Sequence, residues 1–271
     1  MRTLKDHLIL YDAECPMCNL YTGAFVKAGM LDRNGRAAYQ QAVTTCPQID
    51  IQRAVNEIAL VNRNTGEVTY GVKSLFTILG NAFPVAKPLF ASRFFTACMR
   101  RLYAFISYNR RVIIPAGENA HTFAWQPAFH KKYRIAYLIV TWLVTATILA
   151  AYSGTIAAHI PQSGFYREFA FCGGQILFQG LVLLKVRKEA VWDYLGNMMT
   201  ISLAGGLLLL PALLLHANGI LSAAGCVGWF LAVAACMLLE HVRRTSLLKV
   251  GYIPTLTWVL YRILLLLTLI L

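Results

Sequence analysis

The feature that most constrains this fold is a series of long apolar runs in the second half of the chain. Each run is near the roughly 20 residues that a helix needs to cross a bilayer. The runs occupy residues 136–158, 169–186, 195–215, 220–239 and 253–271. The chain is 58% hydrophobic and 14% charged, which is too apolar for a soluble protein of 271 residues. We therefore predict a membrane domain over residues 135–271, an all-α transmembrane bundle of about five helices.

Basic residues at the ends of these runs predict which ends face the cytoplasm. They precede the first run and follow the second and the fourth: Lys131, Lys132, Arg134, Lys185, Arg187, Lys188, Arg243, Arg244 and Lys249. By the positive-inside rule these ends are cytoplasmic. The first residues include no apolar segment of signal-peptide length, so we also expect the N-terminal domain in the cytoplasm. The loop charges and the missing signal peptide together predict an integral protein of the inner (cytoplasmic) membrane, with its N-terminal domain in the cytoplasm.

The N-terminal half of the chain is basic. It holds 17 of the 25 Lys and Arg residues and 8 of the 12 Asp and Glu residues, so about nine of the thirteen formal charges precede Ile135. Such charge beside a bilayer favours the membrane lipid as a partner. Nucleic acid is not expected as a partner, because no basic cluster is interleaved with base-stacking aromatic residues.

Short apolar runs and helical spacing alternate over residues 1–115, which predicts an α/β domain, followed by a juxtamembrane linker at 116–134. Strands are expected at 7–11, 36–41, 57–61 and 67–70, a hairpin turn at 64–66, and helices at 16–30, 72–79 and 88–108. The last helix carries apolar residues on one face: Phe90, Phe94, Cys98, Leu102 and Phe105. It either covers the sheet or lies on the lipid headgroups.

A C-x-x-C dithiol stands between the first expected strand and the first expected helix. Cys15 falls at the helix N-terminus, where backbone N–H groups and the helix dipole stabilise a thiolate, so Cys15 is the candidate nucleophile. Cys18 lies one turn on, about 5 Å along the axis, where it can resolve a mixed disulfide. Asp12 either carries the proton of Cys18 during exchange or is a helix cap or turn residue.

Asp12, Cys15 and Cys18 resemble the D-x-x-C-x-x-C motif of the DCC family of thiol-disulfide oxidoreductases. The resemblance spans about residues 8–115 and rests on further blocks: Gln40 with Gln41, residues 57–80 with Gly71-Val-Lys-Ser, and residues 103–111 with Asn109-Arg110. It implies a thioredoxin-like fold and a redox role, with the dithiol itself as the redox centre and no other cofactor. The dithiol predicts a protein thiol or disulfide, or a low-molecular-weight thiol, as substrate.

Two observations weigh against parts of this interpretation. Thioredoxins place a cis-proline just before a strand, whereas here Pro47 stands ten residues before the strand expected at 57–61. A C-x-x-C pair is also half of a zinc site. The remaining candidate ligands in the first half form no second close pair: Cys46, Cys98, His7, His121 and His130. No metal is therefore expected.

Polar residues inside apolar spans are costly and mark candidate functional positions. The candidate intramembrane polar site comprises Cys172, Gln175, Gln179, Asn197 and Arg262. These residues either hydrogen-bond the helices together, which we favour, or form a pocket for a ligand such as a quinone. Arg262 either faces Glu168 or Gln175, or the last run is not a full span. A thiol relay through Cys172 and Cys226 is disfavoured, because neither belongs to a C-x-x-C pair.

The leading hypothesis is a membrane-tethered thiol-disulfide oxidoreductase with a cytoplasm-facing dithiol. The rival is a membrane transport or signalling module in which the thioredoxin-like domain is a redox sensor or is not catalytic. A third possibility is a structural role beside a membrane protein partner, which is compatible with both the dithiol and the intramembrane polar residues.

Overall fold

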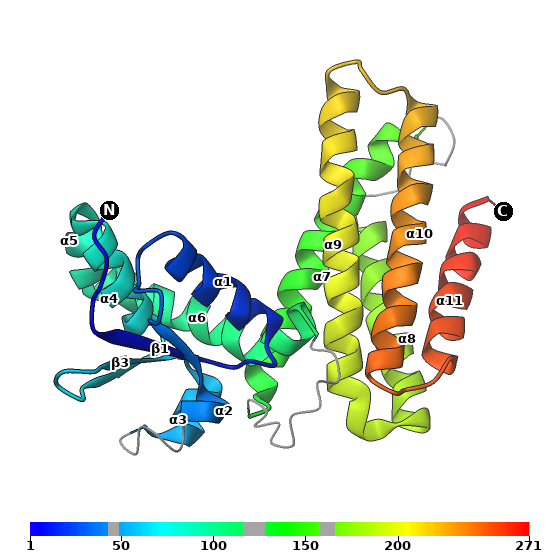
Figure 1. Cartoon of the computed structure of the whole chain (residues 1–271). Helices are drawn as coiled ribbons and strands as arrows, with labels where there is room; N and C mark the ends of the chain where they lie inside the picture. The colour runs from blue at the N-terminus through cyan, green and yellow to red at the C-terminus, as the bar shows by residue number, and fades with distance from the viewer. Residues whose placement is uncertain (43–48, 116–127, 158–165, 271) are drawn as a thin grey trace. The chain divides into compact units, whose positions relative to one another are not determined.

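The computed structural model describes residues 1–42, 49–115, 128–157 and 166–270. The chain divides into two compact units, Met1–Tyr133 and Arg134–Leu271. The first unit contains a four-stranded sheet with helices, and the second is helical (Figure 1). The predicted combination of an α/β domain and an all-α bundle is confirmed at this level. The predicted linker falls mainly on residues 116–127, which lie outside the described residues.

The strands of the first unit are arranged in the order β2-β1-β3-β4. Their bounds are His7–Tyr11 for β1, Arg36–Ala38 for β2, Ala59–Asn62 for β3 and Val68–Tyr70 for β4. β1 pairs in parallel with β2 and antiparallel with β3, and β3 pairs antiparallel with β4. Leu10 lies opposite Ala59, and Ala59 lies opposite Tyr70. The end of β1, the start of β3 and the end of β4 therefore meet at one end of the sheet.

Helices pack on both faces of this sheet. They are α1 (Pro16–Lys27), α2 (Tyr39–Ala42), α3 (Ile51–Asn56) and α4 (Val72–Ala82). Because alternate strand residues point to opposite faces, the β1 neighbours Ile9 and Leu10 belong to different cores. Ile9 packs with residues of α1 and α4, and Leu10 with residues of α2 and α3.

Several predicted boundaries in the first unit are wrong. The strand expected at 36–41 ends at Ala38, where α2 begins. Helix α3 was not predicted, although Asp50 caps it by accepting the Arg53 N–H at 3.0 Å. Helix α4 continues through Gly80 to Ala82, because Gly80 leaves room for the Phe90 ring, which lies 3.4 Å from where a Cβ would be.

The helix expected at 88–108 is two helices, α5 (Lys87–Ala91) and α6 (Arg93–Ile113). Ser92 divides them by accepting the Phe95 N–H and capping α6. The apolar face of α6 does not cover the sheet: Phe94 is 81% and Leu102 is 47% exposed, and Cys98 is exposed. The buried residues of α6 lie in its C-terminal half instead, and the exposed apolar residues remain available to a lipid surface.

The second unit is built mainly from five helices. They are α7 (Lys131–Thr155), whose first three residues belong to the first unit, α8 (Arg167–Val186), α9 (Val191–Ala217), α10 (Ala223–Leu247) and α11 (Ile253–Ile270). Within the described residues, four are long and apolar enough to cross a bilayer: α7, α8, α9 with the short turn before it, and α10. The described apolar stretch of α11, Ile253–Thr268, is shorter. The chain thus has four clear candidate spans and a shorter fifth apolar helix.

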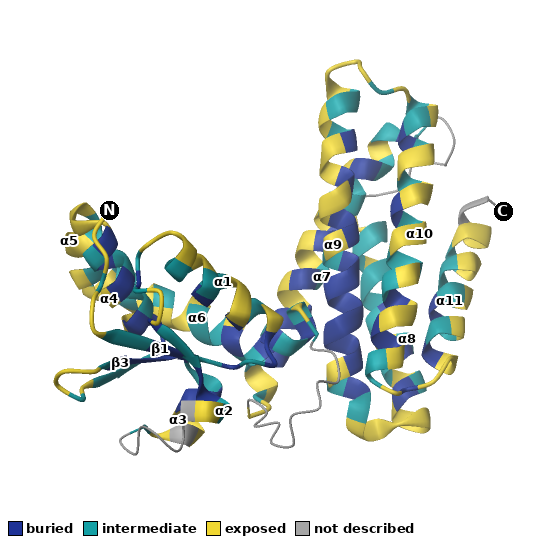
Figure 2. Cartoon of the chain, viewed as in Figure 1, coloured by how far each residue is buried: buried dark blue, intermediate teal, exposed yellow. Residues whose placement is uncertain are grey.

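Helix α9 carries the main core of this unit. Figure 2 shows buried residues along its first half, where Tyr194, Met198 and Met199 are at most 2% exposed. Large apolar side chains on the neighbouring helices are instead exposed, including Leu177 at 71% and Leu239 at 71%. An apolar core combined with an apolar exterior is typical of helices that contact lipid.

Candidate functional site

The dithiol lies in the turn that joins β1 to α1. The Cys15 N–H donates to the Asp12 carbonyl at 3.1 Å and closes this turn. Cys15 is the N-cap of α1, and its Sγ accepts the backbone N–H of Cys18 at 3.3 Å. Pro16 occupies the first helical turn, where its missing N–H has no cost. The sulfur of Cys15 thus takes the place of the capping oxygen at the helix N-terminus, as predicted.

The two thiols differ in acidity. A hydrogen bond from the Cys18 side chain lowers the pKa of Cys15 to about 7; burial opposes this shift, and the Arg110 charge reinforces it. The pKa of Cys18 is raised well above its usual range, because its thiol donates to Cys15 and because it is buried. Cys15 therefore deprotonates first, and Cys18 stays protonated until Cys15 has reacted.

Asp12 anchors the turn through its buried carboxylate, which is 3% exposed. Oδ1 accepts the Glu14 N–H at 3.1 Å and the Gln40 amide at 3.0 Å. Oδ2 accepts the Arg110 guanidinium at 3.1 Å, with Arg111 at 3.7 Å. In the part of the chain that the structure describes, its partners are these groups and not the thiols. The hydrogen bond from the Glu14 N–H to the Asp12 carboxylate forms a local turn. This matches the turn role, one of the two roles that the sequence predicted for Asp12.

Arg110 is the site residue that sequence reasoning did not assign. Its guanidinium is buried, bonds Asp12, and also donates to the Val55 carbonyl at 2.9 Å. A buried arginine here supplies a fixed positive charge close to both sulfurs. The available signal was the Asn109-Arg110 block near the end of the domain. The structure brings this block and Gln40 to the dithiol turn.

Several buried polar atoms around this turn have no hydrogen-bond partner among the described residues. They are Glu14 Oε1, Arg110 Nε, Arg111 Nε and Arg111 Nη2. Unsatisfied buried polar groups are rare in folded proteins and need a reason where they occur. All four atoms belong to three residues near the dithiol, Glu14, Arg110 and Arg111, and each can still bond water or a bound molecule.

Two tyrosines lie beside Cys18. Burial raises the pKa of Tyr21 and of Tyr103 well above the usual value, so both hydroxyls stay protonated. The Tyr103 hydroxyl accepts the Ile58 N–H at 2.8 Å, at the start of β3. The dithiol is thus flanked by neutral hydroxyls and by one guanidinium charge.

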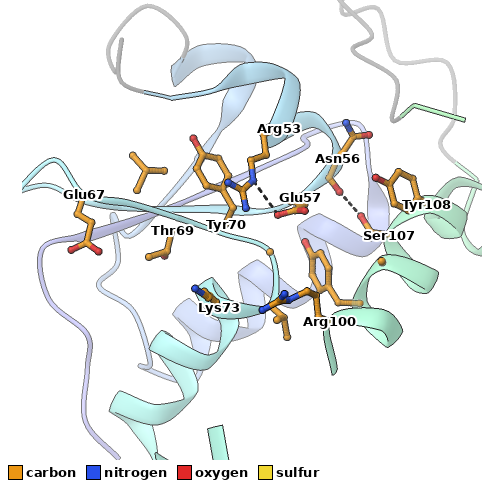
Figure 3. Close-up of a pocket in the computed structure, with 15 residues that line it drawn as sticks. Arg53, Asn56, Glu57, Glu67, Thr69, Tyr70, Lys73, Arg100, Ser107 and Tyr108 are labelled. Atoms are coloured by element: carbon orange, nitrogen blue, oxygen red, sulfur yellow. Dashed lines mark hydrogen bonds and ion pairs between the residues drawn. The ribbon is translucent and has the colours of Figure 1, made fainter. Parts of the chain in front are cut away.

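A cavity of about 470 Å³ opens at the same end of the sheet (Figure 3). It is lined by the end of α3, the β4 hairpin, the start of α4 and the middle of α6. Neither Cys15 nor Cys18 lines it. Tyr103 lines the cavity and interacts electrostatically with Cys18, which contributes to its raised pKa.

The residues weighed as zinc ligands form no metal-binding group in the described part of the chain. Cys46 and His121 lie outside the described residues, as does Pro47. Over the described ranges, no group of three or more His, Cys, Asp or Glu residues has a geometry that could hold a metal ion. No peptide bond of the described residues is cis.

The predicted intramembrane site separates into different contacts. Gln179 Oε1 accepts the Tyr194 hydroxyl at 3.0 Å, and that hydroxyl also bonds His241 Nε2 at 3.0 Å. Asn197 Oδ1 instead accepts Arg244 Nη1 at 2.9 Å. Tyr194, His241 and Arg244 were missed, because helical periodicity does not show which faces of distant helices meet.

Arg262 does not pair with Glu168, which binds Arg167 at 2.8 Å. Its guanidinium lies 4.2 Å from the centre of the Trp258 ring, a cation–π distance. Gln175 is buried on α8, and its amide nitrogen has no partner among the described residues. Cys172 is half-buried and Cys226 is buried, and both are free thiols.

The acidity of Cys15 predicts the pH dependence of its alkylation. Because its pKa is lowered, the reactive thiolate prevails above pH about 7 and is lost as the pH falls below that value. The iodoacetamide rate of Cys15, measured by mass spectrometry between pH 5 and 10, should therefore have its midpoint near 7. The exposed Cys98 gives the reference profile in the same sample. A Cys15 midpoint at or above that of Cys98 would contradict the arrangement.

Comparison of this chain with models of known protein families, with curated proteins and with solved structures gives no match.

Proposed function

We propose that the chain is a membrane-anchored thiol-disulfide oxidoreductase whose N-terminal unit has a thioredoxin-like fold and resembles the DCC family. The observation that carries the proposal is the N-cap position of Cys15, with a lowered pKa and with Cys18 one turn away. The strand order β2-β1-β3-β4, with one parallel pair and a final hairpin, supports the proposed fold. The dithiol at the turn after β1 supports it further.

The proposed reaction is a reversible thiol-disulfide exchange. The Cys15 thiolate attacks a substrate disulfide, so the substrate S–S bond breaks as a Cys15–substrate disulfide forms, and the departing thiolate takes up a proton. Cys18 then loses its proton and attacks Cys15 Sγ, which releases the second substrate thiol and leaves a Cys15–Cys18 disulfide. Two external thiols, on one protein or on two small molecules, supply two electrons, restore the dithiol and are oxidised to a disulfide.

The protein groups act on this reaction through charge and position. Arg110 stabilises the Cys15 thiolate, and Asp12 holds Arg110 in place at 3.1 Å. Cys15 is 2% exposed, so a substrate must displace the residues that cover it. The unsatisfied atoms of Glu14 and Arg111 beside it are groups that such a substrate can bond.

The second unit serves in this proposal as the membrane anchor. We propose the inner membrane with the dithiol on the cytoplasmic side, supported by the basic residues at the ends of α7, α8 and α10.

The rival function, a transport or signalling module with a redox-sensing domain, is favoured by one observation. Gln179, Tyr194 and His241 form a buried polar network inside the bundle.

Trapping of mixed disulfides tests the proposed function. With Cys18 replaced by serine, the Cys15–substrate disulfide cannot be resolved, so Cys18→Ser expressed in cells should yield adducts that dithiothreitol releases. The measurement is a non-reducing gel followed by mass spectrometry of the released partners. The matched control is the double variant Cys15→Ser, Cys18→Ser, which should form none of them. Equal adducts in both variants, or none in either together with no glutathione exchange in the native chain, would sink the proposal.

A further inference from the structure

The cavity of Figure 3 lies close to the dithiol because of the sheet register. The turn with Cys15 follows β1, and Gly71 follows β4, two strands away at the same end of the sheet. Adjacent strands lie about 4.8 Å apart, so these two points are on the order of 10 Å from one another. A small molecule of tripeptide size can span that distance. The volume of about 470 Å³ falls within the range of about 300–1,000 Å³ that is typical of small-molecule sites.

Three basic side chains, Arg53, Lys73 and Arg100, and two acidic ones, Glu57 and Glu67, line the cavity, so its lining has a net formal charge of about +1. Lys73 and Arg100 line it, both are exposed, and neither forms an ion pair with any described residue. Arg53 is already engaged, since it pairs with Glu57 at 3.4 Å and stacks on the Tyr70 ring at 4.4 Å. The cavity therefore has two cations free to bind an anionic group, most simply a carboxylate.

Gly71 brings an acidic group and a helix end into the same cavity. Its φ of +64° belongs to the region that favours glycine, and a Cβ there would lie 2.9 Å from the Glu57 carboxylate oxygen. Gly71 gives α4 no side-chain cap, so the positive end of that helix also faces this region. Glu57 Oε2 is paired with Arg53 at 3.4 Å, so its other oxygen, Oε1, is the atom that can accept an N–H group of a ligand whose carboxylate lies against Lys73 and Arg100. The donors and acceptors thus fit a molecule that carries a carboxylate and also N–H groups.

We propose that this cavity binds the carboxylate-bearing end of a low-molecular-weight peptide thiol or its disulfide. Lys73 and Arg100 hold the carboxylate, Glu57 accepts a ligand N–H, and the ligand sulfur extends along the end of the sheet toward Cys15. This inference rests on the proposed oxidoreductase function and names the class of its small-molecule substrate. The reaction is the reverse of the exchange described above: one peptide thiolate attacks Cys15 and releases the Cys18 thiol, and a second peptide thiolate attacks the mixed disulfide, which releases Cys15 and forms the peptide disulfide.

Binding without chemistry tests the cavity. The full chain carrying Cys15→Ser, in lipid nanodiscs, is titrated calorimetrically with S-methylglutathione, which has the peptide carboxylates but no thiol. We expect saturable binding that Arg100→Gln and Lys73→Gln each weaken by about tenfold, because each removes a charged hydrogen-bond donor. The matched control is Arg101→Gln, since Arg101 is exposed, adjacent in the sequence and outside the cavity lining. Its affinity should stay within about twofold of the parent.

Three results would overturn the cavity proposal: no binding, equal losses in Arg100→Gln and Arg101→Gln, or inorganic phosphate binding as tightly as the peptide. The two proposals fail separately. If Cys18→Ser traps disulfides but S-methylglutathione does not bind, the cavity proposal is wrong and the proposed oxidoreductase function stands. If S-methylglutathione binds specifically but there is neither trapping nor thiol exchange, the cavity binds the peptide and the proposed oxidoreductase function is wrong.

Discussion

Replacement of Arg110 by glutamine is expected to lower the unfolding free energy of the N-terminal unit by about 3 kcal/mol, because it leaves a buried carboxylate without its main counter-charge. The Arg110 side chain is 6% exposed and that of Asp12 is 2% exposed, so water cannot replace the lost partner. The Val55 carbonyl would lose a donor as well. Urea-dependent pulse proteolysis of the full chain in nanodiscs measures the change.

The adjacent arginine is the matched control. Arg111 is 25% exposed, and its Nη2 lies 3.7 Å from Asp12 and 3.8 Å from Glu14, so Arg111→Gln should cost less than about 1 kcal/mol. If Asp12 is the reason for the Arg110 effect, Asp12→Asn should reduce the cost of Arg110→Gln in a double-mutant cycle. Equal stability of Arg110→Gln and the native chain would mean that Arg111 and Gln40 suffice for Asp12.

The same variant should change the dithiol. The Arg110 charge contributes to the lowered pKa of Cys15, so its removal raises that pKa. The alkylation midpoint of Cys15 should then move above pH 7, toward that of an ordinary thiol near about 8.5. An unshifted midpoint would show that the Cys18 hydrogen bond alone sets the acidity of Cys15.

The local part of this site could be predicted from sequence, and the long-range part could not. A strand, a turn with C-x-x-C and a helix follow from residues 7–27, because each signal lies within a few residues of the next. The pairing of Arg110 with Asp12 joins positions that are 98 residues apart. No local pattern reports such a contact. The cavity was missed for the same reason, since α3, β4, α4 and α6 form it jointly.

The misplaced helices have a similar cause. Gly80 is a helix terminator by local preference, but the Phe90 ring packs against it and the helix continues. In the second unit the apolar runs predicted four spans that the structure bears out, because length and hydropathy suffice for that, whereas the fifth run forms a shorter apolar helix. They did not show which helix faces meet, so Gln179 was predicted without its partners Tyr194 and His241.

Tyr194 is the centre of the polar network in the second unit, and one assignment of donors satisfies the chain of contacts. Thr255 donates to His241 Nδ1 at 3.1 Å, and His241 Nε2–H donates to the Tyr194 oxygen at 3.0 Å. The Tyr194 hydroxyl then donates to Gln179 at 3.0 Å, and the Gln179 amide donates to Thr257 at 3.2 Å. In this assignment the bonds run in one direction from Thr255 to Thr257, and the His241 proton is placed on Nε2.

Tyr194→Phe removes one oxygen from this chain and is expected to lower the stability of the bundle by about 1–3 kcal/mol. His241 loses its acceptor and Gln179 loses a donor, and two such bonds inside a membrane protein are worth about that amount. Unfolding of the full chain by sodium dodecyl sulfate in mixed micelles measures the loss. The control is Tyr252→Phe, since Tyr252 is 77% exposed and its hydroxyl has no place in the network. Equal losses of stability in both variants would contradict the central place of Tyr194 in the network.

The same variant also separates the two proposed functions. If the Tyr194→Phe protein keeps native stability but loses its cellular function, and Cys18→Ser traps no mixed disulfide, the transport or signalling module is favoured over the oxidoreductase.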